Sequence, residues 1–316
     1  LYPDCTVVTL PLKDAHDMLK AGREDELFKA ALFQSKKKLP DKLVRSSDLW
    51  DSARTRPGFG LSWPWPSLTS LTRGIRRGEG YYFGAGVKMG KSELVDTIAK
   101  QVIVDDNLPC FLAKPEQAPS KTYQKLVGKA AGRIFHDPTI AFDEEAYDKA
   151  EPLIGDKALI VDSYQMVNWE TLKDDIRYAV QVDGAKDVIL DPITVFTNHM
   201  SSSEANDFLI SMAAEISMMS MDLDFTAYLF CHLKAPESGA THERGGEVLS
   251  TQFAGSRAMM RSCNYMIGMQ GNKSPDLTPE ERNIRELVLL EDREFGMSGK
   301  VPLYWDRHTG LFQELK

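Results

Sequence analysis

Short apolar runs and amphipathic stretches alternate along most of this chain. From about Gly74 onward, apolar runs typical of buried strands are followed by stretches with apolar residues three or four positions apart, which predict helices. Strands are predicted at 79–85, 108–114, 157–163, 186–192, 225–234 and 265–270. Helices are predicted at 91–105, 121–134, 169–182, 204–221 and 254–264. This alternation predicts an α/β fold with a mostly parallel central sheet and helices on both faces.

The two ends of the chain depart from this alternation. Residues 5–22 predict a strand, a turn and a short helix, and 24–35 predict a second helix. A charged, proline-containing linker follows, and in it 46–54 predict a short helix capped by Ser46 or Ser47. The segment 56–68 is rich in Pro, Gly and Trp, so we expect it to be ordered but not helical. The last strands, at 285–294, 300–307 and 310–315, are predicted to form hairpins.

Composition narrows the class of protein. The 316 residues are 42% hydrophobic and 27% charged, as in ordinary globular proteins, and the net charge of -8 argues against a surface broadly coated for DNA. The four cysteines form no CxxC pair, and Cys110 and Cys231 lie in strand-like runs that predict buried free thiols. No run is long enough for a membrane span, so we expect a cytoplasmic protein. The chain begins at Leu1 inside an apparent element, which indicates part of a longer protein.

The stretch "AGVKMGKSEL" carries the clearest chemical signal. It lies between a predicted strand and a predicted helix, and it matches the phosphate-loop pattern G-x-x-x-x-G-K-[ST] except that Ala85 stands where the first glycine is expected. Backbone N–H groups of such a loop bind phosphates at a helix N-terminus. Lys91 would reach the β- and γ-phosphates, and the Ser92 hydroxyl would ligate Mg²⁺.

Carboxylates at the ends of other predicted strands fit the same site. Asp191 ends the strand at 186–192, where a Walker-B aspartate would hold Mg²⁺ through water; Asp162 is a competing candidate, and we favour Asp191 because a long polar loop follows it. Glu116 follows the strand at 108–114. It is either the base that orients the attacking water or a solvated loop residue.

His232 and Arg293 also lie at strand ends. His232 is either a structural residue or a sensor of the γ-phosphate, since a polar loop follows it. Arg293 could serve as an arginine finger in a neighbouring subunit's site. Spacing alone favours a surface charge at Arg293.

The order of these motifs is itself informative. "LTRGIRRGEG", "AGVKMGKSE", "FLAKPEQ", "DVILDP", "YLFCHLK", "FAGSRAM" and "LLEDREFGMSG" follow one another along the chain. This series resembles the RecA-like P-loop motor of hexameric replicative helicases, the DnaB and Twinkle family, and above all the helicase half of T-odd bacteriophage primase–helicases. The N-terminal segment is similar to the closing part of a Toprim primase domain. The resemblance implies a Toprim remnant at 1–35, a linker with a subunit-docking helix at 36–66 and a RecA-like motor at 67–316.

The resemblance implies a role for each matching residue. Glu116 would be the catalytic base, Lys91 the phosphate-binding lysine, His232 the phosphate sensor and Arg293 the finger acting in trans. Ser92 and Asp191 would hold Mg²⁺. The nucleotide would be bound by Gly86, Val87, Lys88, Met89, Gly90, Lys91, Ser92 and Glu93, with Tyr304 or Trp305 stacking on its base. Two loops, 194–205 and 234–251, would grip DNA through Asn198, His199, Lys234 and Arg244.

The implied activity is NTP-driven 5′–3′ translocation on single-stranded DNA by a homo-oligomeric ring, with ATP or dTTP and Mg²⁺. Six subunits and a replicative DNA polymerase as a partner of the parent protein are expected from the resemblance. Three features depart from the family: Glu291 replaces the second cation of the finger motif, Ala254 replaces an arginine, and the loop at 234–251 has fewer lysines. A RecA-type recombinase ATPase and a non-catalytic nucleotide-binding loader or scaffold are the alternatives.

Overall fold

The computed structural model describes residues 5–37, 39–40, 43–56, 58–162 and 168–315. The chain divides into two compact units, Leu1–Gly58 and Phe59–Lys316. The three-part division at residues 35 and 66 stays a prediction.

The first unit contains a two-stranded antiparallel sheet and short helices. Its elements are β1 (Thr6–Val7), α1 (Ala15–Lys20), α2 (Glu24–Phe33), β2 (Lys36–Lys37), the 3-10 helix η1 (Ser46–Leu49) and α3 (Trp50–Arg54). The predicted strand and helices are confirmed, but the predicted serine cap is wrong. The extended residue before η1 is Arg45, which makes no side-chain cap, and the Ser47 hydroxyl instead contacts the Asp48 carboxylate.

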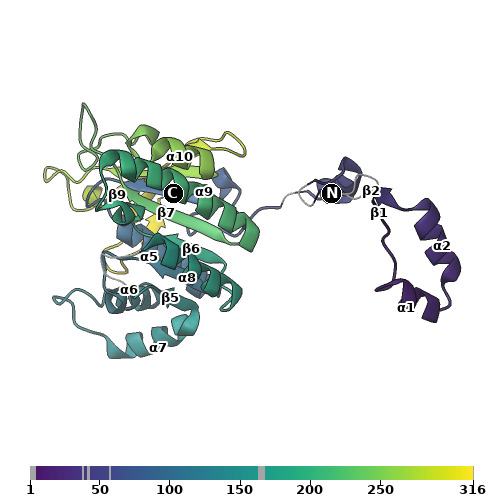
Figure 1. The fold of residues 1–316 in the computed structure, drawn as a ribbon. Helices are drawn as coiled ribbons and strands as arrows, with labels where there is room; N and C mark the ends of the chain where they lie inside the picture. The colour runs from purple at the N-terminus through teal and green to yellow at the C-terminus, as the bar shows by residue number, and fades with distance from the viewer. Residues whose placement is uncertain (1–4, 38, 41–42, 57, 163–167, 316) are drawn as a thin grey trace. The chain divides into compact units, whose positions relative to one another are not determined.

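A single sheet organises the second unit (Figure 1). Its strands are β3 (Gly80–Ala85), β4 (Cys110–Ala113), β5 (Ala158–Ile160), β6 (Asp187–Leu190), β7 (Thr226–His232), β8 (Tyr265–Gly271), β9 (Ile284–Asp292), β10 (Gly299–Trp305) and β11 (Phe312–Glu314). Within the described residues their order is β11-β10-β9-β8-β3-β7-β6-β4-β5. The strands from β8 to β5 are parallel, and β9, β10 and β11 are joined in antiparallel hairpins. Both the parallel sheet and the C-terminal hairpins were predicted, and both are confirmed.

Helices cover both faces of this sheet. They are α4 (Pro66–Thr72), α5 (Lys91–Lys100) with its π-helical continuation η2 (Gln101–Asp105), α6 (Pro119–Ala131), α7 (Glu144–Ile154), α8 (Trp169–Gln181), α9 (Ser202–Leu223) and α10 (Ser256–Ser262). The 3-10 turns η3 (Gly155–Lys157), η4 (Ile193–Thr197) and η5 (Ser250–Gln252) lie between these helices, and η6 (Glu281–Asn283) lies between β8 and β9. Helices α4 to α7 pack in one hydrophobic core, and α8, α9 and α10 pack in the other.

The strands supply both cores because successive side chains point to opposite faces. Tyr81 and Phe83 of β3 lie in the core under α5, whereas Tyr82 between them lies in the core under α9. Every residue of β3 is buried. The fully buried Trp65 joins the first of these cores and donates a hydrogen bond to the Phe312 carbonyl at 2.9 Å. Such two-sided burial explains why the central strands read as continuous apolar runs.

Two helices were not predicted. Helix α4 begins inside the segment expected to be non-helical, because Pro66 at the first helical position has no N–H to leave unsatisfied. Helix α7 begins after Asp143, whose carboxylate accepts a hydrogen bond from the Ala146 N–H at 3.0 Å. Acidic residues at 144 and 145 favour a helix start at that point, a signal that sequence reasoning overlooked.

The thiols of Cys110, Cys231 and Cys263 are free and buried, as predicted for the first two. Among the helices of the described ranges, none has the length and apolar character needed to cross a membrane.

A buried carboxylate at the start of β6 ties neighbouring strands together. Asp187, 1% exposed, accepts hydrogen bonds from the Arg77 guanidinium at 2.7 Å and the Tyr228 hydroxyl at 2.9 Å. Arg77 also donates to the Thr226 hydroxyl at 3.0 Å. Burial raises the pKa of Asp187, and Arg77 opposes this by stabilising the carboxylate.

We predict that Arg77→Ala lowers the free energy of unfolding by about 3 kcal/mol, because it leaves a buried carboxylate without its cation. Chemical denaturation measures this change. Arg177, which pairs with Asp174 on the surface of α8, is the matched control, and Arg177→Ala should cost less than about 1 kcal/mol. Equal effects of the two substitutions would contradict this account of Asp187.

Candidate nucleotide site

The phosphate loop runs from the end of β3 to the start of α5. Gly90 has φ 105°, in the left-handed region that favours glycine, and a Cβ added at Gly86 would lie 2.5 Å from the Cβ of His242. These two glycines are therefore required by the loop. Ala85, by contrast, is the last residue of β3 and pairs with His232 of β7. The missing first glycine falls in the strand, where alanine is tolerated.

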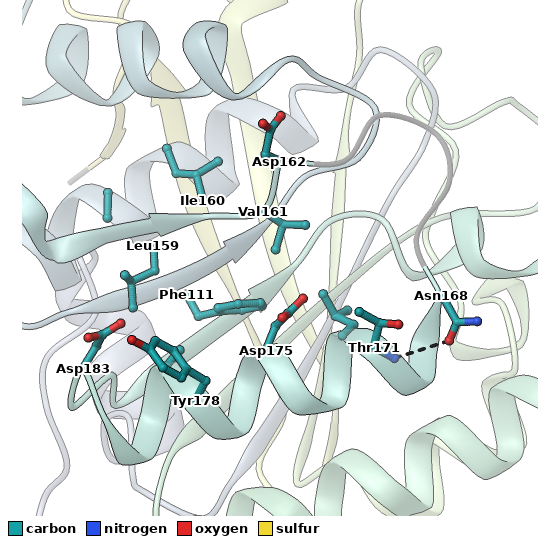
Figure 2. Close-up of a pocket in the computed structure, with 13 residues that line it drawn as sticks. Phe111, Leu159, Ile160, Val161, Asp162, Asn168, Thr171, Asp175, Tyr178 and Asp183 are labelled. Atoms are coloured by element: carbon teal, nitrogen blue, oxygen red, sulfur yellow. Dashed lines mark hydrogen bonds between the residues drawn. The ribbon is translucent and has the colours of Figure 1, made fainter.

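Lys91 and Asp191 form a buried ion pair at the centre of this site. Their side chains are 6% and 4% exposed, and the ammonium of Lys91 donates to the Asp191 carboxylate. This contact favours Asp191 over Asp162 as the Walker-B residue. Asp162 instead borders a hollow of about 660 Å³ between the edge strand β5 and α8, together with Asp175 and Asp183 (Figure 2). Apart from Asp162, none of the residues that line this hollow was predicted to belong to the nucleotide site.

Glu116 and His232 meet beside this ion pair. Strands β4, β6, β7 and β3 are neighbours in that order, so the residues that follow them share the carboxyl edge of the sheet. The His232 Nε2 lies 3.6 Å from a carboxylate oxygen of Glu116. Burial lowers the pKa of His232, and the charge of Lys91 lowers it further. The half-buried imidazole is therefore held toward its neutral form.

The donor set fits a magnesium ion carried by a nucleotide. Mg²⁺ is usually bound through one or two carboxylates together with substrate phosphates and water. The Asp191 carboxylate contacts Lys91, and Ser92 follows Lys91 in the first turn of α5. Among the described residues, no group of three His, Cys, Asp or Glu side chains that could hold a metal is present.

A network of ion pairs fixes the phosphate-loop helix to its neighbours. Lys114, just after β4, donates to the Asp96 carboxylate of α5, and both are buried. Glu93, predicted to contact nucleotide, points its carboxylate at Lys125 and Lys129 of α6 instead. If Glu93 contacts nucleotide, it does so through its backbone and not through its carboxylate. Burial alone would raise the pKa of Glu93, but these two ammonium groups outweigh it and lower the pKa to about 2.

Two cations that the sequence reasoning did not single out hold the loop from its other side. The guanidinium of Arg285, 4% exposed, donates to the carbonyls of Met89 at 2.9 Å and Arg282 at 2.7 Å. Burial lowers the pKa of Arg285 to about 10. The Lys273 ammonium donates to the Lys88 carbonyl at 3.0 Å, and Lys88 has φ 60°. Val87 is exposed at the loop tip.

The aromatic candidates lie on opposite faces of β10. Trp305 packs against the core that contains α5, and it pairs in register with Phe312 of β11. The Phe312 ring reaches to 3.1 Å from a Cβ added at Gly90, so this face of the hairpin borders the phosphate loop. Tyr304 faces the other way. This geometry favours Trp305 for the predicted contact with the base.

The four residues predicted to bind DNA are exposed. Asn198 and His199 follow η4, and Lys234 and Arg244 lie in the loop after β7. Because β6 and β7 are adjacent parallel strands, both loops leave the same edge of the sheet.

Arg293 lies at the opposite edge. Strand β9 is antiparallel to β8, so Arg285 pairs with Gly271 near the phosphate loop while Asp292 pairs with Tyr265 at the far end. The length of β8 implies a separation of roughly 20 Å between the two ends. Arg293 is exposed and donates to the Arg261 carbonyl at 2.6 Å. The Arg293 side chain therefore cannot reach the phosphate loop of the same chain.

Comparison with known proteins agrees with this geometry. No protein-family model matches the chain. The chain is 25% identical over 318 residues to a DNA helicase/primase of Enterobacteria phage T3, an alignment that covers 97% of this chain and 56% of that protein. The chain is similar to a phage helicase–primase. The resemblance predicted from the motifs is thereby confirmed, although the chain spans just over half the length of this relative.

Solved structures with the same fold extend the comparison. The ATPase domain of G40P superposes with a TM-score of 0.66 at 17% identity, over 85% of this chain and 96% of that chain. A DnaB-like replicative helicase superposes with a TM-score of 0.65 at 17% identity, over 96% of this chain and 72% of that chain. A KaiC-like protein of Pyrococcus horikoshii superposes with a TM-score of 0.57 at 13% identity, over 82% of this chain and 100% of that chain. These neighbours confirm the predicted RecA-like ATPase fold.

Replacing Glu93 tests the network around α5. A carboxyl group whose pKa is lowered on folding stabilises the protein above its unfolded pKa, and this contribution is lost as pH falls through the folded value. For Glu93 the window runs from 4.5 down to about 2. We predict that Glu93→Gln reduces the dependence of unfolding free energy on pH in this window by up to about 1.4 kcal/mol per pH unit. Urea denaturation at several pH values measures it, and parallel curves for the two proteins would contradict the prediction.

Proposed function

We propose that this chain is the motor of a ring-forming replicative DNA helicase that hydrolyses NTPs to move 5′–3′ along single-stranded DNA and unwind duplex. One observation carries the proposal. Lys91, Asp191, Glu116 and His232 come together at one edge of the sheet, whereas Arg293 lies at the other. A site that uses this arginine therefore needs a second subunit. The similarity to a phage helicase/primase supports the same conclusion.

The residues divide the chemistry between them. Lys91 and the loop N–H groups bind the phosphates, and Ser92 and Asp191 would hold a Mg²⁺ ion, which would supply charge neutralisation at the phosphate oxygens. Glu116 orients and deprotonates the attacking water. His232, 3.6 Å from Glu116, responds to the γ-phosphate and relays its presence to the loop that follows β7.

Subunits of the ring complete one another's sites. Arg293 of one subunit stabilises the transferred phosphoryl group in the next, as arginine fingers do. Asn198, His199, Lys234 and Arg244 contact the DNA in the central channel. We propose six subunits, ATP or dTTP as the fuel, and a replicative polymerase as a partner of the full-length protein.

Single-stranded DNA should stimulate NTP hydrolysis by this chain, and a forked duplex with a 5′ tail should be unwound. Glu116→Gln should lower the stimulated rate by at least about 100-fold, the typical contribution of a general base. Steady-state phosphate release measures the rates, and strand separation on the fork measures unwinding.

Glu145, exposed on α7 in a pair with Lys149, provides the control, and Glu145→Gln should leave both activities unchanged. Stimulated hydrolysis without unwinding would indicate a recombinase-type ATPase. Nucleotide binding with no stimulated hydrolysis would indicate a scaffold and would contradict the proposal.

A further inference from the structure

The loop that follows β7 packs one buried side chain against the phosphate loop. In residues 241–245 only His242 is buried, at 3% exposure, while Glu243 and Arg244 beside it face solvent. A Cβ built on Gly86 would lie 2.5 Å from the His242 Cβ and 3.2 Å from its Cγ, so the His242 side chain packs directly against the backbone of Gly86. Only glycine at position 86 permits this approach.

His242 also reaches back to the base of its own loop. Its Nε2 lies 3.2 Å from the Lys234 carbonyl oxygen, a distance at which a protonated Nε2 donates to that carbonyl. Its Nδ1 is buried, and among the residues that the structure describes it has no hydrogen-bond partner. The imidazole thus spans from the first residue of the phosphate loop to Lys234, whose side chain is exposed and predicted to contact DNA.

Other contacts fix the same segment to the apex of the phosphate loop. The Lys273 N–H donates to the Glu243 carbonyl at 2.7 Å, and the Lys273 ammonium donates to the Lys88 carbonyl at 3.0 Å. The Gly245 N–H donates to the Gly271 carbonyl at 3.1 Å. Residues 241–246 are therefore joined to the phosphate loop at two points, directly at Gly86 and through Lys273 at Lys88.

We propose that His242 is a positioning residue that couples the DNA-binding loop to the phosphate loop within one subunit. This inference rests on the proposed helicase function. Because His242 contacts neither the reacting atoms nor DNA directly, its loss should change how strongly one ligand affects the other. Coupling between two sites is a free energy of its own, distinct from the affinity for either ligand.

The test compares NTP hydrolysis by the 316-residue chain with and without single-stranded DNA. His242→Ala should lower the ratio of stimulated to basal rate by at least about five-fold, the lower end of typical coupling. The KM for nucleotide and the Kd for DNA should each change by less than about two-fold, since neither ligand touches His242. His242→Gln, which keeps a donor for the Lys234 carbonyl, should regain at least half of the stimulation.

Two further variants keep this test decisive. His242→Leu fills the same space without a donor, so it should reproduce the loss of stimulation even where His242→Ala fails to fold. His16→Ala, at an exposed position in α1, is the matched control and should behave as wild type.

A ratio within about two-fold of wild type in both His242→Ala and His242→Leu would overturn the coupling role. So would an equal loss of basal and stimulated rates together with nucleotide binding, because that pattern indicates a purely structural residue. A wild-type chain that shows no stimulation would overturn the proposed function itself, and the coupling with it.

Discussion

The buried ion pair between Lys91 and Asp191 is the contact around which the site is built. Two charges removed from water are stable only with partners of opposite charge, and here each provides the partner for the other. In the proposed function, a bound nucleotide would offer both of them replacements, phosphate for the lysine and Mg²⁺ for the aspartate. The parallel sheet makes this exchange possible, because it brings the ends of β3 and β6 to one edge with only β7 between them.

Other buried charges around α5 are also paired with charges of opposite sign. Asp96 holds Lys114 beside the strand end that carries Glu116, and Glu93 holds two lysines of α6. On the other side, Arg285 and Lys273 bind the loop carbonyls. The phosphate loop is thus fixed from several elements at once. Because the phosphate loop is held in this way, even the small contact between Gly86 and His242 would pass a movement of the loop on to residues 241–246, as proposed above.

Sequence reasoning predicted the parts of this molecule that depend on local patterns. Strands β3, β6 and β7 were found because they are buried on both faces, and the residues after them followed from the carboxyl-edge rule for parallel sheets. Helix α7 was missed although Asp143 caps it, and the serine cap proposed for η1 gave way to an extended Arg45. Local signals at helix ends compete with one another, and tertiary contacts decide between them.

The contacts of Arg285 and His242 could not be predicted for a different reason. Each joins segments far apart in the chain, and nothing in the local sequence of either residue indicates its partner. The choice of Asp191 over Asp162 was only favoured from sequence, by the polar loop that follows Asp191, because both residues end apolar strands; the contact with Lys91 supports that choice. The order of the strands accounts for this difference, because only β7 separates β6 from β3, whereas β5 is the edge strand.

Mixing two inactive variants tests most directly whether each site is shared between subunits. Lys91→Ala should lack a working phosphate loop, and Arg293→Ala should lack the finger. In random mixed rings, up to about a quarter of the interfaces would join an intact loop to an intact finger. The account predicts that DNA-stimulated hydrolysis reappears on mixing and exceeds the sum of the separate variants. Full activity of Arg293→Ala alone, or no recovery in rings shown to contain both subunits, would contradict it.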